Sequence, residues 1–369
     1  MAESKVKMKK KGRKKKIALM LGAGGPLGGL EAGALLYLDE MGVEFDVVSG
    51  ACIGSVIGLS YMAPAKGMSG SEAVKLWCNS SCISDYIYDV LPANYKAFWK
   101  DAGIFNSMFE KFVEFMLLAN PGWNMNPQTE WQRFWSDLYS MMVISMSPMM
   151  TTPLSENISR IPVEALSSLV DFNKLNNLNE GVPEDQHKYV YINAMNVTDK
   201  KIEIFDHTQI TPEHLMAGSS LYFLTPQTKI DGKWYAEGSY LDSINFQGIL
   251  EEHEEIDRIV VMNILDGDAL IRRPTNLYDA YILSVVLPFI SIARDDIKIF
   301  DLKYNTEHVV QGGKAVAKKT RKLMTVDFEI PEKDIPKLCE WSHSNFEALK
   351  NIGYEAGKKF YEQYKDFLN

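Results

Sequence analysis

A cysteine flanked by two glycines is the first group in the sequence that is suited to chemistry. Cys52 lies in the stretch Gly50-Ala51-Cys52-Ile53-Gly54, which has the form G-x-S-x-G with cysteine in place of serine. In such a sharp strand-to-helix turn the glycines avoid clashes with the adjacent strand and helix, and the nucleophile stands at the tip. We therefore predict that the sulfur of Cys52 is a nucleophile that attacks a carbonyl carbon.

Two physical effects act in opposite directions on such a thiol. A helix is expected to begin directly after Cys52, and the free N–H groups and partial positive charge at a helix N-terminus favour both a thiolate and an oxyanion. A carboxylate beside the sulfur would instead raise the pKa of the thiol, because two like charges repel. The sequence leaves open which effect is larger.

The elements around Cys52 follow an order of strand, turn and helix that occurs twice. Apolar runs at 17–21 and 45–48 predict strands, and each precedes a glycine-rich turn and a helical pattern, at 29–41 and 53–62. Strands that alternate with helices form a parallel sheet with helices on both faces. We therefore predict an α/β fold with three layers, α/β/α, and a mainly parallel central sheet.

The rest of the chain supplies further strands and helices. The pair Thr211-Pro212 predicts a helix start, and Asp231-Gly232 predicts a hairpin turn. Strand patterns lie at 188–197, 201–205, 229–236, 258–265 and 322–330, and helical patterns lie at 69–79, 106–118, 276–310 (interrupted by Pro288) and 342–368.

Charge is distributed unevenly along the 369 residues. The formal net charge is -9, but residues 1–16 carry nine Lys/Arg against one acid, Glu3, so the remainder holds 30 Lys/Arg and 47 Asp/Glu. We predict that residues 1–16 are a disordered basic tail, for which one alternative is contact with an anionic membrane or lipid surface. The other alternative is a solvated tail without a partner. No nucleic-acid partner is expected.

The cysteines and the apolar stretches indicate in which cellular compartment the protein is expected. Cys52, Cys78, Cys82 and Cys339 show no disulfide framework, and no apolar segment with a cleavage site indicates secretion. The apolar stretch at 280–293 contains Pro288 and is too short to span a bilayer. The sequence therefore predicts a cytoplasmic protein, peripheral at most on membranes or lipid bodies.

A methionine-rich stretch is a candidate wall for an apolar ligand. Five methionines lie within residues 140–150, and methionine adapts to irregular apolar partners. We predict that Met141, Met142 and Met146 bind the acyl chain of a substrate, together with the stretch at 280–293. The alternative is an ordinary buried helix with an adaptable core.

Three segments, in order, resemble the motifs of the patatin-like phospholipase family. Gly24-Gly25-Pro26-Leu27-Gly28 resembles the oxyanion-hole loop of that family, and the stretch around Cys52 resembles its G-x-S-x-G elbow. The stretch from Asp231 to Asp242 resembles the segment with the catalytic aspartate, preceded by the helix end at 217–220. The resemblance implies a patatin-like core over 17–265, with an insertion around 68–180 and a mostly helical extension over 266–369.

The resemblance also implies roles for residues, with three departures. The family uses a serine and an aspartate as a dyad without histidine, and here these positions hold Cys52 and Glu237. The oxyanion hole would consist of backbone N–H groups of Gly24, Gly25 and Ile53, so Leu27, which stands where the family has a basic residue, need not abolish it. A Cys–His pair with His214 or His253 is a less favoured alternative.

Two functions follow from the resemblance and its departures. The first is an acyl hydrolase or acyltransferase that forms an acyl-thioester on Cys52 from lipid esters, thioesters or other acyl esters. The second is an inactive lipid-binding or scaffold protein on the same fold. Nucleotide binding by the first glycine loop is disfavoured, because Leu27 stands where a G-x-G-x-x-G fingerprint has glycine. No cofactor and no metal are expected, because the six histidines lack zinc-ligand spacing.

Overall fold

The computed structural model describes part of the chain. The described residues are 16–82, 84–86, 93–94, 98–99, 129, 131, 166–222, 227–250, 253, 255–265, 270–274, 277–311, 314–331 and 340–368. The helical pattern at 106–118, the methionine-rich stretch at 140–150 and residues 1–15 lie outside them. Lys16 is a correction to the expected tail, because it is buried and begins the first strand.

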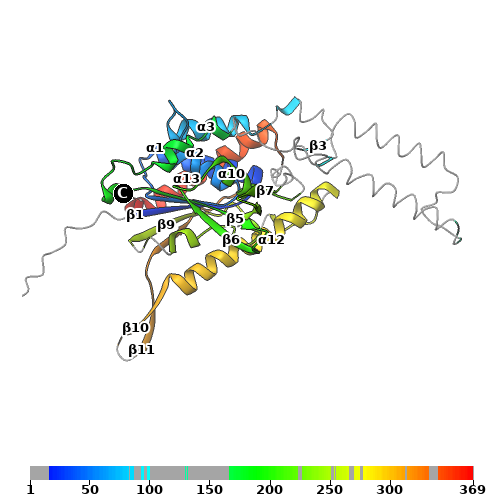
Figure 1. Cartoon of the computed structure of the whole chain (residues 1–369). Helices are drawn as coiled ribbons and strands as arrows, with labels where there is room; N and C mark the ends of the chain where they lie inside the picture. Colours follow the sequence, from blue (N-terminus) through cyan, green and yellow to red (C-terminus); the bar gives the residue numbers. More distant parts are fainter. Residues whose placement is uncertain are drawn as a thin grey trace, which may run out of the picture.

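A mixed, mostly parallel sheet forms the centre of the fold (Figure 1). Its strand order is β12-β9-β1-β2-β5-β8-β7, and β6 also pairs with β5. The strands from β12 to β5 are parallel, whereas β6, β8 and β7 join by antiparallel pairing. The strands are β1 (Lys16–Leu21), β2 (Val47–Gly50), β5 (Tyr189–Asn196), β6 (Lys201–Asp206), β7 (Thr228–Ile230), β8 (Lys233–Glu237), β9 (Ile256–Met262) and β12 (Lys322–Thr325).

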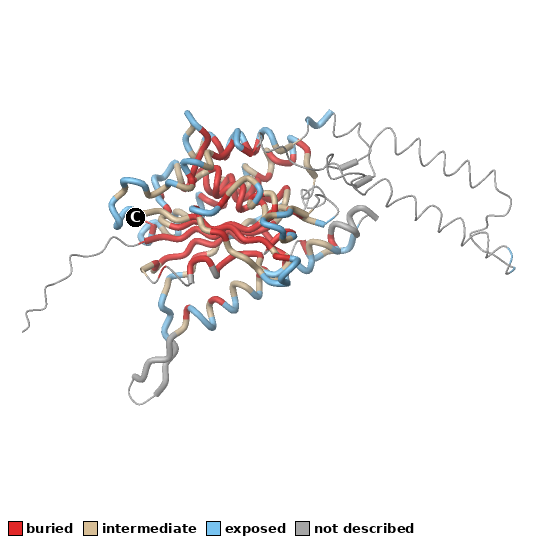
Figure 2. The backbone as a smooth tube through the Cα atoms, in the orientation of Figure 1, coloured by how far each residue is buried: buried red, intermediate tan, exposed pale blue. Residues whose placement is uncertain are grey.

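Helices cover both faces of this sheet, which confirms the three-layer α/β/α fold. Side chains alternate along β1, so Leu19 and Leu21 pack on one face while Ala18 and Met20 pack on the other. The strands are accordingly buried along their lengths (Figure 2). The first face carries α1 (Gly28–Glu40), α2 (Ile53–Met62), α3 (Gly70–Ser80), α10 (Pro212–Gly218) and α13 (His343–Leu368), and the second carries α11 (Gln247–Leu250) and α12 (Leu277–Ile299).

Short-range sequence signals fix the starts of two helices. Ser69 and Glu72 form a capping box before α3, and Thr211 caps α10 with Pro212 in its first turn. The smaller elements are α9 (Phe172–Asn176), η1 (Gly25–Leu27), η2 (Glu184–Gln186), η3 (Gly238–Tyr240), the π-helical turn η5 (Phe300–Tyr304), and the strands β3 (Ala93–Asn94) and β4 (Phe98–Trp99).

The chain after β9 differs from the expected pattern in two places. Helix α12 continues through Pro288, which lies on its exposed face. Residues 306–310 were expected to be helical, but β10 (Thr306–Gln311) and β11 (Lys314–Lys319) pair as an antiparallel hairpin. This hairpin projects from the body below the sheet (Figure 1).

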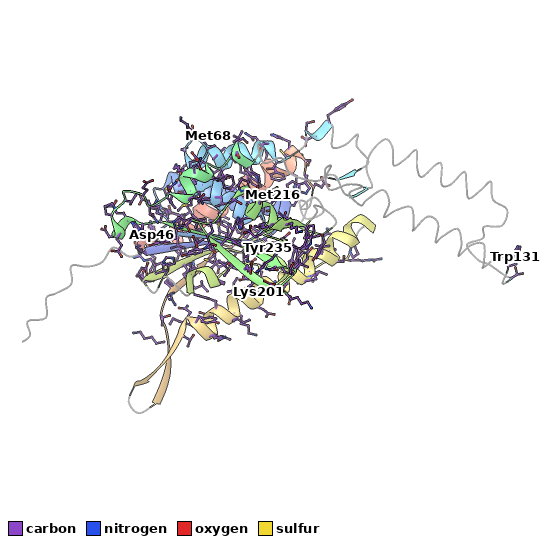
Figure 3. All side chains as sticks on the ribbon, viewed as in Figure 1. Asp46, Met68, Trp131, Lys201, Met216 and Tyr235 are labelled. Carbon is purple, nitrogen blue, oxygen red and sulfur yellow. The ribbon has the colours of Figure 1, made fainter. Side chains whose placement is uncertain are left out.

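The parallel strands begin at one side of the sheet and end at the opposite side, so their N-terminal and C-terminal ends are far apart. Asp46 precedes β2 and accepts a hydrogen bond from the N–H of Ile17 at 2.8 Å, and Figure 3 shows it at the edge where β1 and β2 begin. The two glycine-rich turns follow the other ends of these strands, at Leu21 and Gly50. Among the described helices, none combines the length and the apolar composition that crossing a bilayer requires.

Candidate active site

Cys52 stands at the tip of a strained turn between β2 and α2. Its φ of 50° and ψ of -119° are unusual for a residue with a side chain. A Cβ on Gly50 would lie 2.6 Å from the backbone nitrogen of Ser55, and one on Gly54 would lie 2.5 Å from the carbonyl oxygen of Leu21. Both positions therefore require glycine, as expected for a nucleophile elbow.

Glu237, at the end of β8, reaches the elbow from a distant part of the sequence. It pairs in register with Ala194 of β5, and its side chain is buried. Its carboxyl group lies beside the thiol of Cys52, close enough for its charge to raise the pKa of that thiol. Oε1 accepts a hydrogen bond from the hydroxyl of Ser239 at 2.7 Å, whereas Oε2 is buried without a hydrogen-bond partner. The structure thus brings together the two residues of the expected dyad.

The turn after Glu237 is shaped by a close approach of Gly238 to β5. A Cβ on Gly238 would lie 2.3 Å from Oδ1 of Asn193, so a larger residue would displace the end of β8. The amide of Asn193 donates to the carbonyl of Asp242 at 2.8 Å, which holds the loop beyond η3. Sequence reasoning did not identify Asn193 or Ser239; an expected register between β5 and β8 is the signal that would have indicated Asn193.

Backbone N–H groups from both glycine-rich turns converge on the sulfur. The N–H groups of Gly24 and Ile53 lie near the sulfur of Cys52 and lower the pKa of its thiol. Backbone donors from two turns beside the nucleophile are what an oxyanion hole needs, and the role of Gly24 and Ile53 in one stays a prediction. Gly25, with a φ of 55°, begins η1 beside them, and its role as a donor stays a prediction.

The first glycine loop is fixed by hydrogen bonds to α1 and to the loop that follows Glu237. The N–H of Gly22 donates to Oε1 of Glu31 at 2.6 Å, and the N–H of Ala23 donates to the carbonyl of Ser243 at 3.3 Å. Glu31 is fully buried on α1, and burial raises its pKa well above the ordinary value. Leu27, where the family has a basic residue, is a buried core side chain, so packing fills that position.

Burial dominates the electrostatics of the dyad. Cys52 keeps part of its surface exposed, yet enough protein surrounds the sulfur that desolvation is the largest cause raising its pKa well above the ordinary value. The charge of the neighbouring Glu237 raises this pKa further, and the N–H groups of Ile53 and Gly24 lower it. Burial also raises the pKa of Glu237. The effects that favour the neutral thiol are therefore larger.

A further carboxyl group, that of Asp296, ties the loop after Glu237 to α12. Asp296 on α12 accepts hydrogen bonds from the N–H groups of Ser243 and Ile244, at 2.7 and 3.3 Å. Burial, followed by the charge of Asp242, raises the pKa of Asp296 to about 7, and burial raises that of Asp242 to about 6. Asp296 lies 53 residues after Ser243, and no sequence motif links them.

The remaining expected site residues are not placed at Cys52. Met141, Met142 and Met146 lie outside the described residues. His214 bonds the cap residue Thr211, and His253 bonds the hydroxyl of Tyr191 at 2.8 Å, just before β9 begins. Within the part of the chain that the structure describes, no group of His, Cys, Asp and Glu side chains is arranged to hold a metal ion.

Replacing Glu237 by Gln is expected to speed the alkylation of Cys52 by iodoacetamide at neutral pH. The substitution removes a charge that raises the pKa of the thiol, and each unit by which that pKa falls gives about tenfold more thiolate. Peptide mass analysis would follow the reaction at Cys52. The matched control is Glu203→Gln, since Glu203 bonds Tyr235 instead. Equal rates in both variants would mean that Glu237 does not act on the sulfur.

Several solved structures of low sequence identity are similar to the chain, among them VipD, a cytosolic phospholipase A2 and ExoU. VipD from Legionella pneumophila is 14% identical, with a TM-score of 0.42, 95% of this chain covered and 67% of VipD. Human GIVD cytosolic phospholipase A2, in complex with methyl gamma-linolenyl fluorophosphonate, is 10% identical, with a TM-score of 0.39, 96% of this chain covered and 59% of the other. ExoU of Pseudomonas aeruginosa, in complex with SpcU, is 13% identical, with a TM-score of 0.34, and the coverages are 95% and 51%.

The solved structures are too distant to assign a family, so the assignment rests on a family model. No curated protein sequence matches the chain. The chain spans about two thirds of VipD and between half and three fifths of the other two proteins. The model of patatin-like phospholipases matches residues 19–250, which include the first glycine loop, the elbow and Glu237. The chain therefore belongs to the patatin-like phospholipase family, a family of lipid hydrolases.

Proposed function

We propose that the protein is an acyl hydrolase or acyltransferase that acts on lipid esters or thioesters through Cys52 and Glu237. The observation that carries the proposal is the buried carboxyl group of Glu237 beside the thiol of Cys52, with the N–H groups of Gly24 and Ile53 near the same sulfur. A nucleophile, a base and two oxyanion donors are the groups that acyl transfer needs.

In the first half of the reaction, Cys52 takes the acyl group. Glu237 accepts the proton of the thiol while the sulfur attacks the carbonyl carbon of the ester. The negative charge that develops on the carbonyl oxygen is stabilised by the N–H groups of Gly24 and Ile53, with Gly25 as a further candidate. The carbon–oxygen bond to the alcohol then breaks, the alcohol leaves with the proton from Glu237, and an acyl-thioester remains on Cys52.

In the second half, an acceptor removes the acyl group. Glu237 takes a proton from water, or from an alcohol in acyl transfer, and the oxygen attacks the thioester carbon. The bond to sulfur breaks, the thiolate of Cys52 is protonated by Glu237, and the acid or new ester leaves. Met141, Met142 and Met146 remain candidates for contacts with the acyl chain.

The raised pKa values of the dyad bear on how the proton moves. A carboxylate is a weak base, and a thiol is easier to deprotonate than a serine hydroxyl, so cysteine suits a dyad without histidine. Burial raises the pKa of Glu237, which makes it a stronger base, but burial also raises the pKa of Cys52. Proton transfer within the attack step, rather than a resting thiolate, fits both shifts.

A second candidate function is lipid binding without turnover. The raised pKa of Cys52 favours it, because a neutral thiol is a poor nucleophile. The two candidates share contact with an acyl lipid and differ in covalent chemistry.

Turnover of chromogenic p-nitrophenyl esters separates the two candidates. A series of increasing acyl-chain length, offered to the intact chain, is expected to give release of p-nitrophenol above the buffer rate, with a preferred chain length. Lipid-bound protein without release at any chain length would contradict the hydrolase and support the binding function.

A further inference from the structure

The end of α12 and the π-helical turn η5 expose large apolar side chains to solvent. Ile299 is 52% exposed, Leu302 is 62% exposed and Tyr304 is 43% exposed. The lysines Lys298 and Lys303 are exposed within the same segment, and the ammonium group of Lys303 lies over the ring of Tyr304. Apolar groups that alternate with lysines in this way are typical of segments that lie in a lipid interface.

The charge of this region is opposite to that of the rest of the body. Residues 298–304 and 318–322 together hold six Lys/Arg against one acid, Asp301, although the chain beyond residue 16 is strongly acidic. We name as the basic–apolar face the residues Lys298, Ile299, Leu302, Lys303, Tyr304, Lys318, Lys319 and Arg321. Lys322 is not part of it, because its ammonium group lies over the rings of Tyr364 and Phe367 on α13.

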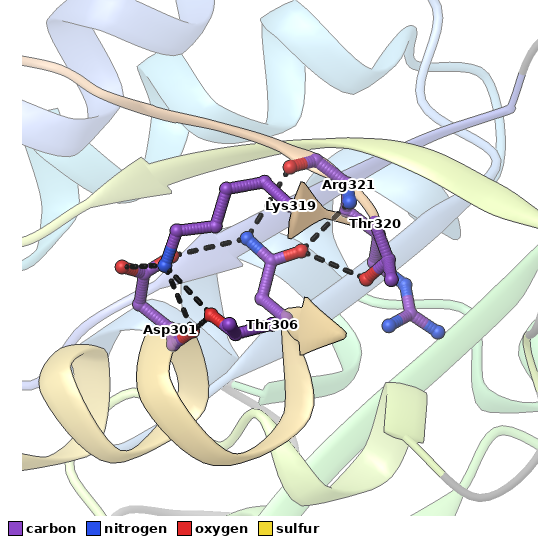
Figure 4. A network of polar contacts seen from close by, with 6 residues as sticks. Asp301, Thr306, Lys319, Thr320 and Arg321 are labelled. Atoms are coloured by element: carbon purple, nitrogen blue, oxygen red, sulfur yellow. Dashed lines mark hydrogen bonds and ion pairs between the residues drawn. The ribbon is translucent and has the colours of Figure 1, made fainter. Parts of the chain in front are cut away.

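A polar network holds the two parts of the basic–apolar face together (Figure 4). Lys319 forms an ion pair with Asp301 of η5 and donates to the hydroxyl of Thr306 at 2.9 Å. Oδ1 of Asn305 accepts hydrogen bonds from the N–H of Arg321 at 2.7 Å and from Thr320 at 3.1 Å. Asp301 is therefore neutralised by Lys319, and the bonds of Asn305 hold the backbone of Arg321 beside η5.

The basic tail enters the structure at the same edge of the sheet. Arg321 donates to the carbonyl of Ile256 at 3.1 Å, and Ile256 pairs with Lys16 at the start of β1. Residues 1–15, which carry eight Lys/Arg, directly precede Lys16. Cys52 follows the opposite end of β2, so the basic–apolar face lies away from the candidate active site.

We propose that the basic–apolar face docks the protein on an anionic lipid surface. The charges would approach the phosphate and carboxylate headgroups, while Ile299, Leu302 and Tyr304 would insert among the upper parts of the acyl chains. A nucleic acid would satisfy the charges but offers nothing to bury Ile299 and Leu302, because aliphatic side chains do not stack on bases as aromatic rings do. The docking holds the protein at its substrate and leaves the dyad outside the contact.

Vesicle sedimentation with the full chain tests this proposal. The wild type is expected to bind phosphatidylcholine vesicles that contain phosphatidylserine, to bind pure phosphatidylcholine poorly, and to be released by salt. Lys303→Glu with Lys318→Glu is expected to weaken binding by about tenfold or more, since each basic residue near such a surface contributes about fivefold. Ile299→Ser with Leu302→Ser is expected to weaken it severalfold.

Matched controls come from other exposed positions of the body. Lys66→Glu with Lys75→Glu makes the same change of charge, and Ile271→Ser replaces an isoleucine that is also 52% exposed. These variants are expected to bind as the wild type does. Turnover of a soluble p-nitrophenyl ester, measured in parallel, is expected to be unchanged in all of them, so loss of docking and loss of catalysis are distinguished.

Two results would overturn the proposal. One is equal vesicle binding by the face variants and the control variants. The other is binding to both vesicles and a single-stranded oligonucleotide that depends on Lys303 and Lys318 but not on Ile299 and Leu302, which would make the face a site for polyanions in general.

Discussion

Replacing Cys52 by Ala is expected to lower kcat/KM for a chromogenic ester by about 10⁴-fold or more. Loss of a nucleophile that forms a covalent intermediate leaves only the contribution of the oxyanion donors and of binding. The methyl group of alanine occupies the place of the cysteine Cβ at a φ of 50°, so the elbow is expected to keep its shape.

A second cysteine provides the control for this loss. Cys82→Ala changes a half-buried free thiol near the end of α3 and is expected to leave kcat/KM unchanged. Thermal melting of both variants checks that they are folded. Turnover by a folded Cys52→Ala protein at the wild-type rate would exclude the sulfur from the reaction.

Replacing Gly33 by Ala is expected to destabilise the protein, although the same change in most helices stabilises them by about 1 kcal/mol. A Cβ on Gly33 of α1 would lie 2.0 Å from the carbonyl oxygen of Lys350 on α13, and one on Gly353 would lie equally close to the carbonyl oxygen of Leu30. These are backbone atoms of packed helices, so the helices must separate. We expect a loss of about 3 kcal/mol in the free energy of unfolding, measured with urea.

The control for Gly33→Ala is a helical position that faces solvent. Asn351→Ala lies on the exposed side of α13 and is expected to change the free energy of unfolding by less than about 0.5 kcal/mol. A Gly33→Ala protein as stable as the wild type would mean that α13 does not pack against α1 as closely as these distances require.

Local signals in the sequence were sufficient for much of the fold. Asp231-Gly232 marks the turn between β7 and β8, and the glycines on either side of Cys52 mark a turn that admits no larger residue. These features depend on a few adjacent residues, so a motif or a period of hydrophobicity reveals them. The order of strands and helices then predicted the three layers.

Other features depend on segments that meet only in the folded chain. The pKa of Cys52 is set first by burial, and burial depends on elements from several parts of the sequence. The contact of Asp296 with the loop after Glu237 has no local pattern. Helical periodicity was extended too far, to residue 310, and Gly312-Gly313, a hairpin-turn signal, was not used to predict β10 and β11.

The most direct test of Cys52 as the nucleophile is the intact mass of the protein after rapid mixing with a p-nitrophenyl ester and acid quench. We expect an added mass equal to one acyl group, located on Cys52 by peptide analysis. Neutral hydroxylamine is expected to remove it, and the Cys52→Ala protein is expected not to acquire it. Ester turnover with the acyl group on another residue, or with the same adduct in Cys52→Ala, would contradict this role of Cys52.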